Sequence, residues 1–181
     1  IAGGTAAVSV YGFLIFAGSF IYPLIYGICD ALQPAVGYNW GARRYDRIKQ
    51  IEKYVFSTVC AIALLLAAVM AVFPECTRLF MVDVSQDILV MSRDAFRFYA
   101  LSYVFRWFPL ACGSLLTAVE KTKLASLLSF CMVTLLPLAV LFALKPLGLL
   151  GLWLNAPVSA GIAALISIWI LIVFRRELHL E

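Results

Sequence analysis

Residues 124–144 read LASLLSFCMVTLLPLAVLFAL, a stretch without a single charged side chain. A helix of about 20 apolar residues is long enough to cross the roughly 30 Å hydrocarbon core of a bilayer. The stretch lacks the period-two alternation of a barrel strand, and a helix satisfies all its backbone hydrogen-bonding groups within the segment. Residues 124–144 therefore predict a transmembrane helix.

Four more apolar runs accompany this stretch, and they extend the prediction to the whole chain. They cover residues 1–29, 54–73, 98–119 (interrupted only by Arg106) and 147–174. Together the five runs predict membrane spans at about 5–39, 51–73, 88–119, 122–144 and 147–174. The connections are too short for a separate soluble domain. We therefore predict an all-α fold, a polytopic transmembrane helix bundle of five spans occupying residues 1–181.

The composition excludes several classes of protein. The chain is 64% hydrophobic and 13% charged, whereas a soluble domain is about half apolar and a quarter charged. We found no phosphate-binding loop, HExxH or GxSxG motif, no CxxC pair, and one histidine, His179, near the end. We therefore expect no enzyme, no metal site and no cofactor. The net charge of +4 comes from residues that flank apolar runs, so nucleic acid is not an expected partner.

Basic residues also predict an orientation, because alternate connections of a helical bundle lie on the same side. One side holds Arg43, Arg44, Arg47, Lys49, Lys53, Lys121, Lys123, Arg175 and Arg176, and the other holds Arg78, Arg93, Arg97 and Lys145. By the positive-inside rule the first side, with the C-terminus, is cytoplasmic in a multi-pass protein of a bacterial inner (cell) membrane. Residues 45–53 fit either an amphipathic turn along the lipid headgroups or a solvated loop.

Two ionisable residues fall near the middle of the predicted spans. Asp30 precedes Gly41 by 11 residues and Arg106 precedes Lys121 by 15, which places them about 16 Å and 22 Å into the membrane. Charges at such a depth are retained mainly where they face a cavity or a partner. Asp30 and Arg106 are therefore expected either to line a cavity and face each other across it, or to form a buried ion pair that only fixes packing.

Further polar residues lie near these two charges on the helical repeat. Tyr26, Asp30 and Gln33 share one stripe of the first span, and Asn155 supplies an amide to the last. The predicted cavity residues are Tyr26, Asp30, Gln33, Arg106 and Asn155. Proline removes a backbone donor and loosens the preceding turn, so the predicted hinges are Pro23, Pro34 and Pro109.

Residues 26–53, YGICDALQPAVGYNWGARRYDRIKQIEK, contain the pattern QPxxGYNxGAxxxxR followed by a basic stretch and four more spans. This arrangement resembles the C-terminal half of the multidrug and toxic compound extrusion (MATE) family, spans eight to twelve of twelve. The chain would then be one partial lobe of a two-lobe transporter. Its start at Ile1, with no methionine or signal, also suggests that an N-terminal lobe of the same protein is missing.

The resemblance implies a secondary active multidrug exporter that works by alternating access in contact with membrane lipid. Such proteins exchange small cationic or amphipathic compounds for an inward flow of sodium or protons. In this chain Asp30 would bind the coupling cation and Arg106 would tune it. Two alternatives stay open: a lipid-linked oligosaccharide flippase of the same broad fold, and a non-transporting membrane scaffold subunit in which Asp30 and Arg106 only set packing.

Overall fold

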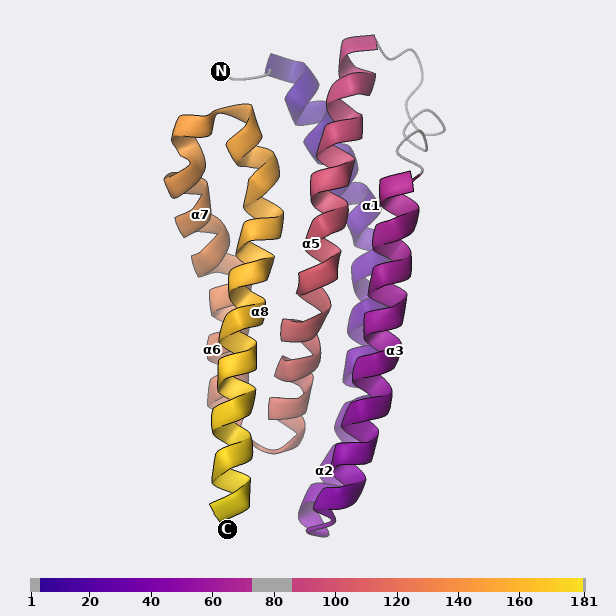
Figure 1. Cartoon of the computed structure of the whole chain (residues 1–181), viewed down its shortest axis with the longest axis vertical. Coiled ribbons are helices and arrows are strands. Elements are labelled where there is room, and N and C mark those ends of the chain that lie inside the picture. The colour runs from indigo at the N-terminus through magenta and orange to yellow at the C-terminus, as the bar shows by residue number, and fades with distance from the viewer. Residues whose placement is uncertain (1–3, 73–85, 181) are drawn as a thin grey trace.

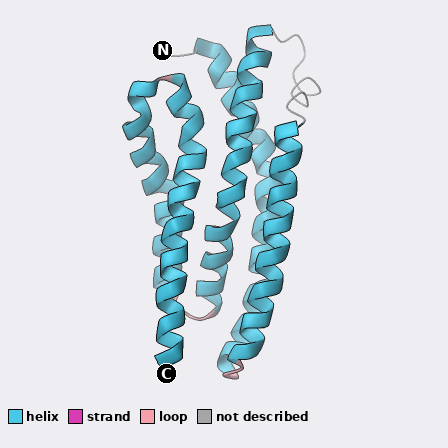
Figure 2. Cartoon of the chain, viewed as in Figure 1, coloured by secondary structure: helices cyan, strands magenta, loops and turns pink. Residues whose placement is uncertain are grey.

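A computed structural model describes residues 4–72 and 86–180, and every element in that part of the chain is helical (Figure 2). The elements are α1 (Gly4–Asp30), α2 (Leu32–Gly41), α3 (Tyr45–Val72), α5 (Gln86–Ala118), α6 (Thr122–Phe130), a π-helical turn (Cys131–Leu135), α7 (Leu136–Leu144), a 3-10 turn (Lys145–Leu147) and α8 (Leu149–Leu180). The all-α prediction is confirmed. The predicted end of the second span at residue 73, and the basic residue Arg78, lie outside the described residues.

The helices lie side by side as a bundle (Figure 1). α1, α5 and α8 run in one direction, while α3 and the α6–α7 segment run in the other. As a result α2, the α5–α6 turn and the C-terminal end of α8 lie at one end of the bundle, which we call the basic end. The prediction of orientation assumed that these connections lie on the same side, and the structure places them there.

Helix α5 is the central element, because it packs against α1, α2, α3, α6 and α8. Its buried side chains include Ala100, Tyr103, Ala111 and Leu115. Small residues such as the two alanines let neighbouring helices approach closely, which favours packing in a membrane where lipid is as apolar as the side chains. α5 is therefore the support on which residues from the other helices are positioned.

Only four described segments are long and apolar enough to cross a membrane by themselves: Ala7–Gly41, Tyr45–Val72, Thr122–Leu147 and Leu149–Arg176. α5, the third predicted span, is not among them although it runs alongside them. Its sequence carries Arg106 and buried hydroxyls such as Ser102 and Ser114. A helix surrounded by other helices can keep such groups, because they face protein and not lipid.

The prolines have unequal effects on the helices. Pro23 and Pro109 lie inside continuous helices, whereas the first predicted span is divided at Ala31 into α1 and α2. The break falls where Pro34 lacks the N–H that would bond to the carbonyl of Asp30. Pro137 likewise cannot donate to the carbonyl of Val133, and that carbonyl lies in the π-helical turn.

Two Schellman turns end helices at the basic end. Arg43 N–H bonds to the Trp40 carbonyl at 3.0 Å, and Arg44 N–H bonds to the carbonyl of Asn39 at 2.9 Å. Arg43 has a positive φ of 55°, a conformation that glycine usually supplies at this position. The same pattern, with Glu120 at φ 62°, closes α5. The turn after α2 lets α3 begin at Tyr45, so residues 45–53 are neither a loop nor a separate turn but the start of α3.

Candidate functional site

α1 and α5 run parallel and in register, and this register positions the predicted site residues. Ser114 lies level with Asp30, and Arg106 lies level with Tyr22. The two residues of each pair are separated by 84 residues in the sequence. The Asp30–Ser114 contact therefore lies eight residues further along both helices than the Tyr22–Arg106 contact. Eight residues advance a helix by about 12 Å. The α1–α5 seam therefore holds an acidic level and a basic level, about two helical turns apart.

Asp30 forms the acidic level. Its Oδ1 accepts hydrogen bonds from Gln33 Nε2 and from Ser114 Oγ, both at 2.7 Å. Asp30 and Gln33 are half-buried, and Ser114 is buried. Hydrogen bonds to a carboxylate are stronger than those between neutral groups. Within the described part of the chain, Oδ2 of Asp30 receives no hydrogen bond, so this oxygen keeps its capacity to accept one.

Arg106 forms the basic level. Its guanidinium carbon lies 4.9 Å from the centroid of the Tyr22 ring, a cation–π contact. No ion pair joins Arg106 to an acid in residues 4–72 or 86–180. The expectation that Asp30 and Arg106 face or pair with each other is therefore wrong, because the register of α1 and α5 places them at different heights. The alternative of a non-transporting scaffold subunit, in which an Asp30–Arg106 pair sets the packing, therefore loses its main support.

Tyrosines surround the basic level between α1 and α5. Tyr22 packs against Tyr103, with ring centroids 6.0 Å apart, and Tyr103 packs edge to face on Tyr99 at 5.7 Å. Gly18 makes room for them, since a Cβ at this position would lie 3.3 Å from the Tyr99 hydroxyl and 3.4 Å from that of Tyr103. Tyr22 and Ser114 were missed by sequence reasoning. Their spacing of 84 residues from their partners carries no local signal.

The other predicted cavity residues lie apart from this seam or at its edge. Tyr26 is 50% exposed, and the adjacent predicted hinges Pro23 and Pro34 are also exposed. Asn155 on α8 donates from Nδ2 to the carbonyl of Pro137 on α7 at 3.2 Å and accepts a hydrogen bond from Ser159 at 2.9 Å. The structure therefore places Asn155 in the α7–α8 contact and does not bring it to Asp30 or Arg106.

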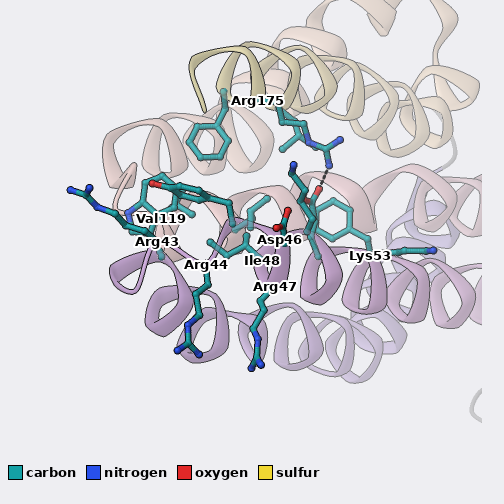
Figure 3. Close-up of a pocket in the computed structure, with 16 residues that line it drawn as sticks. Arg43, Arg44, Asp46, Arg47, Ile48, Lys53, Val119 and Arg175 are labelled. Atoms are coloured by element: carbon teal, nitrogen blue, oxygen red, sulfur yellow. Dashed lines mark hydrogen bonds and ion pairs between the residues drawn. The ribbon is translucent and has the colours of Figure 1, made fainter. Parts of the chain in front are cut away.

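A cavity of about 1000 Å³ lies at the basic end, and none of the predicted cavity residues lines it (Figure 3). It is bounded by the α2–α3 turn, α3, the end of α5 and α8. Inside it Glu52 of α3, which is only 8% exposed, forms an ion pair with Arg175 of α8. Sequence reasoning noted the basic run but missed the cavity, because α8 joins it from more than 100 residues away.

The described residues, 4–72 and 86–180, contain no group of three or more histidine, cysteine, aspartate or glutamate side chains placed to hold a metal ion. Asp30 and Arg106, which lie between the helices, are each held by neutral neighbours: Asp30 by an amide and a hydroxyl, and Arg106 by an aromatic ring. Such a fold and site define a multi-pass helical membrane protein with isolated charges between its helices.

Comparison with known proteins assigns the chain to a family within this class. The family model described as MatE matches residues 1–142, and the chain belongs to that family. No curated protein matches the chain.

Solved structures share the fold. One described as the outward-facing conformation of a multidrug resistance MATE family transporter of the MOP superfamily aligns with a TM-score of 0.83 at 20% identity over 93% of this chain and 38% of its own. Another, described as the inward-facing conformation of a multidrug resistance MATE family transporter of the MOP superfamily, aligns with a TM-score of 0.79 at 18% identity over 93% of this chain and 40% of its own.

A third similar structure is a MOP superfamily transporter from Pyrococcus furiosus, with a TM-score of 0.81 at 19% identity over 93% of this chain and 38% of its own. Its description attributes to that protein a binding pocket of reversed polarity. The present chain thus spans 38% to 40% of the length of these structures.

Proposed function

We propose that this chain is the C-terminal lobe of a secondary active exporter, which couples inward flow of sodium or protons to export of cationic or amphipathic compounds. The observation that carries the proposal is the Asp30 carboxylate, which is held at one oxygen by Gln33 and Ser114 and is open at the other. A carboxylate between membrane helices, with one oxygen positioned and one open, suits reversible binding of a small cation. The sequence alone predicted the acid but not the serine that positions it.

Alternating access is supported by the similarity of the chain to two structures described as outward-facing and inward-facing conformations of multidrug resistance MATE family transporters. The TM-scores against the outward-facing and inward-facing structures are 0.83 and 0.79. A lobe that fits both conformations almost equally well is expected to move largely as a rigid body against its partner lobe.

We also propose that the second lobe of the same protein covers the exposed face of α1 around Tyr26, where the substrate cavity would form. Pro23 and Pro34 on that face remain candidate hinges.

The basic end is proposed to face the cytoplasm of a bacterial inner membrane. It carries Arg43, Arg44, Arg47, Lys49, Lys53, Lys121, Lys123, Arg175 and Arg176, whereas the described part of the other end carries Arg93, Arg97 and Lys145. Positive residues in short loops are retained on the cytoplasmic side. The C-terminus would then be cytoplasmic as well.

A second candidate function is favoured by Arg106. A cation inside the bundle without an acidic partner in the described residues suits an anionic group of the transported molecule, as a lipid-linked oligosaccharide diphosphate would supply. The two candidates differ in the charge of the substrate. A cationic dye moves only in the first, and a lipid-linked diphosphate moves only in the second.

The test is transport by the full-length protein in liposomes with an imposed sodium or proton gradient, using ethidium as the cationic substrate. The Asp30→Asn variant should lose gradient-driven ethidium movement, because it removes the charge and keeps the shape. Asp94→Asn, at the exposed start of α5, is the matched control and should transport as the parent does. Equal transport by the parent protein and Asp30→Asn would reject the coupling role of Asp30.

A further inference from the structure

The cavity at the basic end has an excess of positive charge. Six basic residues line it, namely Arg43, Arg44, Arg47, Lys49, Lys53 and Arg175, against two acids, Asp46 and Glu52. Glu52 is already neutralised by Arg175. Five cations and one acid remain, and no ion pair within the described residues joins these five cations to an acid. A ligand of this cavity is therefore expected to be anionic.

The floor of the same cavity is apolar. Phe56, Leu115, Val119, Leu171 and Phe174 line it, and all but Phe56 are buried. A volume of about 1000 Å³ is far more than an inorganic phosphate needs. A small ion would leave this hydrocarbon floor in contact with water, whereas a molecule with an acyl chain would cover it. The cavity thus fits an anionic amphiphile better than a free anion.

The basic side chains lie at the rim of the cavity, and their charged ends point in different directions and do not converge on one point. Figure 3 shows Arg44 and Arg47 pointing away from α8, while Arg175 on α8 points toward α3. Trp40 and Tyr45 pack edge to face nearby, with ring centroids 5.6 Å apart, and such residues prefer the boundary between headgroups and hydrocarbon. Divergent cations with an aromatic pair favour a broad headgroup at the membrane surface over a single chelated phosphate.

We propose that this cavity binds an anionic phospholipid, with its phosphate headgroup among the basic residues of the α2–α3 turn and its first acyl carbons on the apolar floor. Each basic residue near a membrane surface contributes a roughly fivefold gain in binding of an anionic lipid. The lipid would fill the space between α3 and α8 beside the Glu52–Arg175 pair. This site is separate from the Asp30 level and does not depend on which compounds the protein transports.

The experiment measures quenching of Trp40 fluorescence, because this side chain lines the cavity. The full-length protein, with its other tryptophans replaced by phenylalanine, is titrated in neutral detergent with brominated phosphatidylglycerol, brominated phosphatidylcholine or inorganic phosphate. We expect phosphatidylglycerol to reach half-maximal quenching at a mole fraction at least fivefold lower than phosphatidylcholine. Raising salt from about 50 to about 500 mM should reduce this preference, because ions screen exposed charges.

Variants locate the effect. Arg44→Gln and Arg47→Gln should each weaken the preference for phosphatidylglycerol about fivefold. Both side chains are exposed, so the fold should persist. Arg97→Gln, an exposed cation nearer the opposite end of α5, is the matched control and should keep the preference within about twofold.

Three results would overturn the proposal. The first is equal quenching by the two lipids, which would show that the cavity does not select charge. The second is full displacement of phosphatidylglycerol by inorganic phosphate, which would make this a site for the free ion. The third is a loss of preference in Arg97→Gln as large as in Arg44→Gln. The comparison of lipids and of salt concentrations uses protein in which all arginines are unchanged, so it tests the proposal even if a variant does not fold.

Discussion

Ser114 of α5 donates a 2.7 Å hydrogen bond to the carboxylate of Asp30 on α1, across 84 residues of sequence. Gln33 donates to the same oxygen, also at 2.7 Å, so both donors fix one side of the carboxylate. The bond ties the central helix to the residue just before the α1–α2 break at Ala31. The geometry of the candidate cation site therefore depends on how α1 and α5 are packed.

Replacing Ser114 with alanine should weaken the candidate cation site without removing its charge. A hydrogen bond to a charged group contributes about 1.5–3 kcal/mol. Because Ser114→Ala leaves the Asp30 carboxylate less firmly positioned, we expect it to raise the sodium concentration needed for half-maximal transport by at least about tenfold. Thr117→Ala on the same helix is the control, because the Thr117 hydroxyl donates to the Gly113 carbonyl of its own helix, at 2.9 Å, and not to Asp30. Titration of transport with sodium at constant pH measures the shift. Identical titrations for Ser114→Ala and the parent protein would contradict this role.

The Arg106–Tyr22 contact should depend on the ring and not on its hydroxyl. Cation–π contacts contribute about 0.5–2 kcal/mol, more when they are shielded from water. Tyr22→Leu should lower the stability of the full-length protein by about 1–2 kcal/mol, and Tyr22→Phe should stay close to the parent. Thermal unfolding in detergent measures both variants. A Tyr22→Phe protein as unstable as Tyr22→Leu would show that the hydroxyl, not the ring face, matters.

Glu52 and Arg175 should stabilise the folded protein through their ion pair, so that removing one partner alone is destabilising. Glu52 is 8% exposed, so Arg175→Ala leaves a buried carboxylate without its partner. Arg175 is itself 56% exposed, and we therefore expect a loss of about 1–2 kcal/mol, below the range for a fully buried pair. Glu52→Gln combined with Arg175→Gln should recover part of that loss. Arg176→Ala, at the exposed neighbouring residue, is the control. If Arg176→Ala lowers the melting temperature as much as Arg175→Ala does, the ion pair is not the cause of the loss.

Gly151 should not tolerate a side chain. A Cβ at this position would lie 2.2 Å from the backbone oxygen of Leu144, because α8 begins tightly against the end of α7. Gly151→Ala therefore requires the α7–α8 hairpin to shift, and we expect a loss of at least about 2 kcal/mol. Gly161→Ala in the same helix meets no atom within 4 Å and should be neutral or stabilising by up to about 1 kcal/mol. Comparing melting temperatures of the two variants checks the close approach.

Counting residues from the ends of the predicted spans placed Asp30 and Arg106 close in depth, and this was the main error of sequence analysis. The two depths were counted from Gly41 and Lys121, as if both marked the same membrane level. In the structure a Cβ on Gly37 would lie 3.6 Å from the Ala118 carbonyl, so α2 continues past the level at which α5 ends. Helix ends at unequal depths are set by packing between helices, which a single span does not encode.

Other predictions succeeded because they rest on local chemistry. Apolar runs predicted helical segments, and Pro34 predicted a loosened turn where α1 and α2 separate. α5 was also predicted, although its composition is more polar than that of its neighbours. Asn155 was recognised as a polar residue inside a span, but its partner, the Pro137 carbonyl, could not be inferred because it becomes available only where α7 meets α8.

The sequence by itself determined that the chain forms apolar helices, which of their residues are ionisable, and that most cations lie at one end, because hydrophobicity, helix periodicity and charge are properties of neighbouring residues. Only the tertiary structure decided that Asp30 bonds to Ser114, that Arg106 lies on Tyr22, and that α8 closes a cavity over α3. These contacts depend on the relative height and rotation of helices, which are set by the packing of side chains far apart in the sequence.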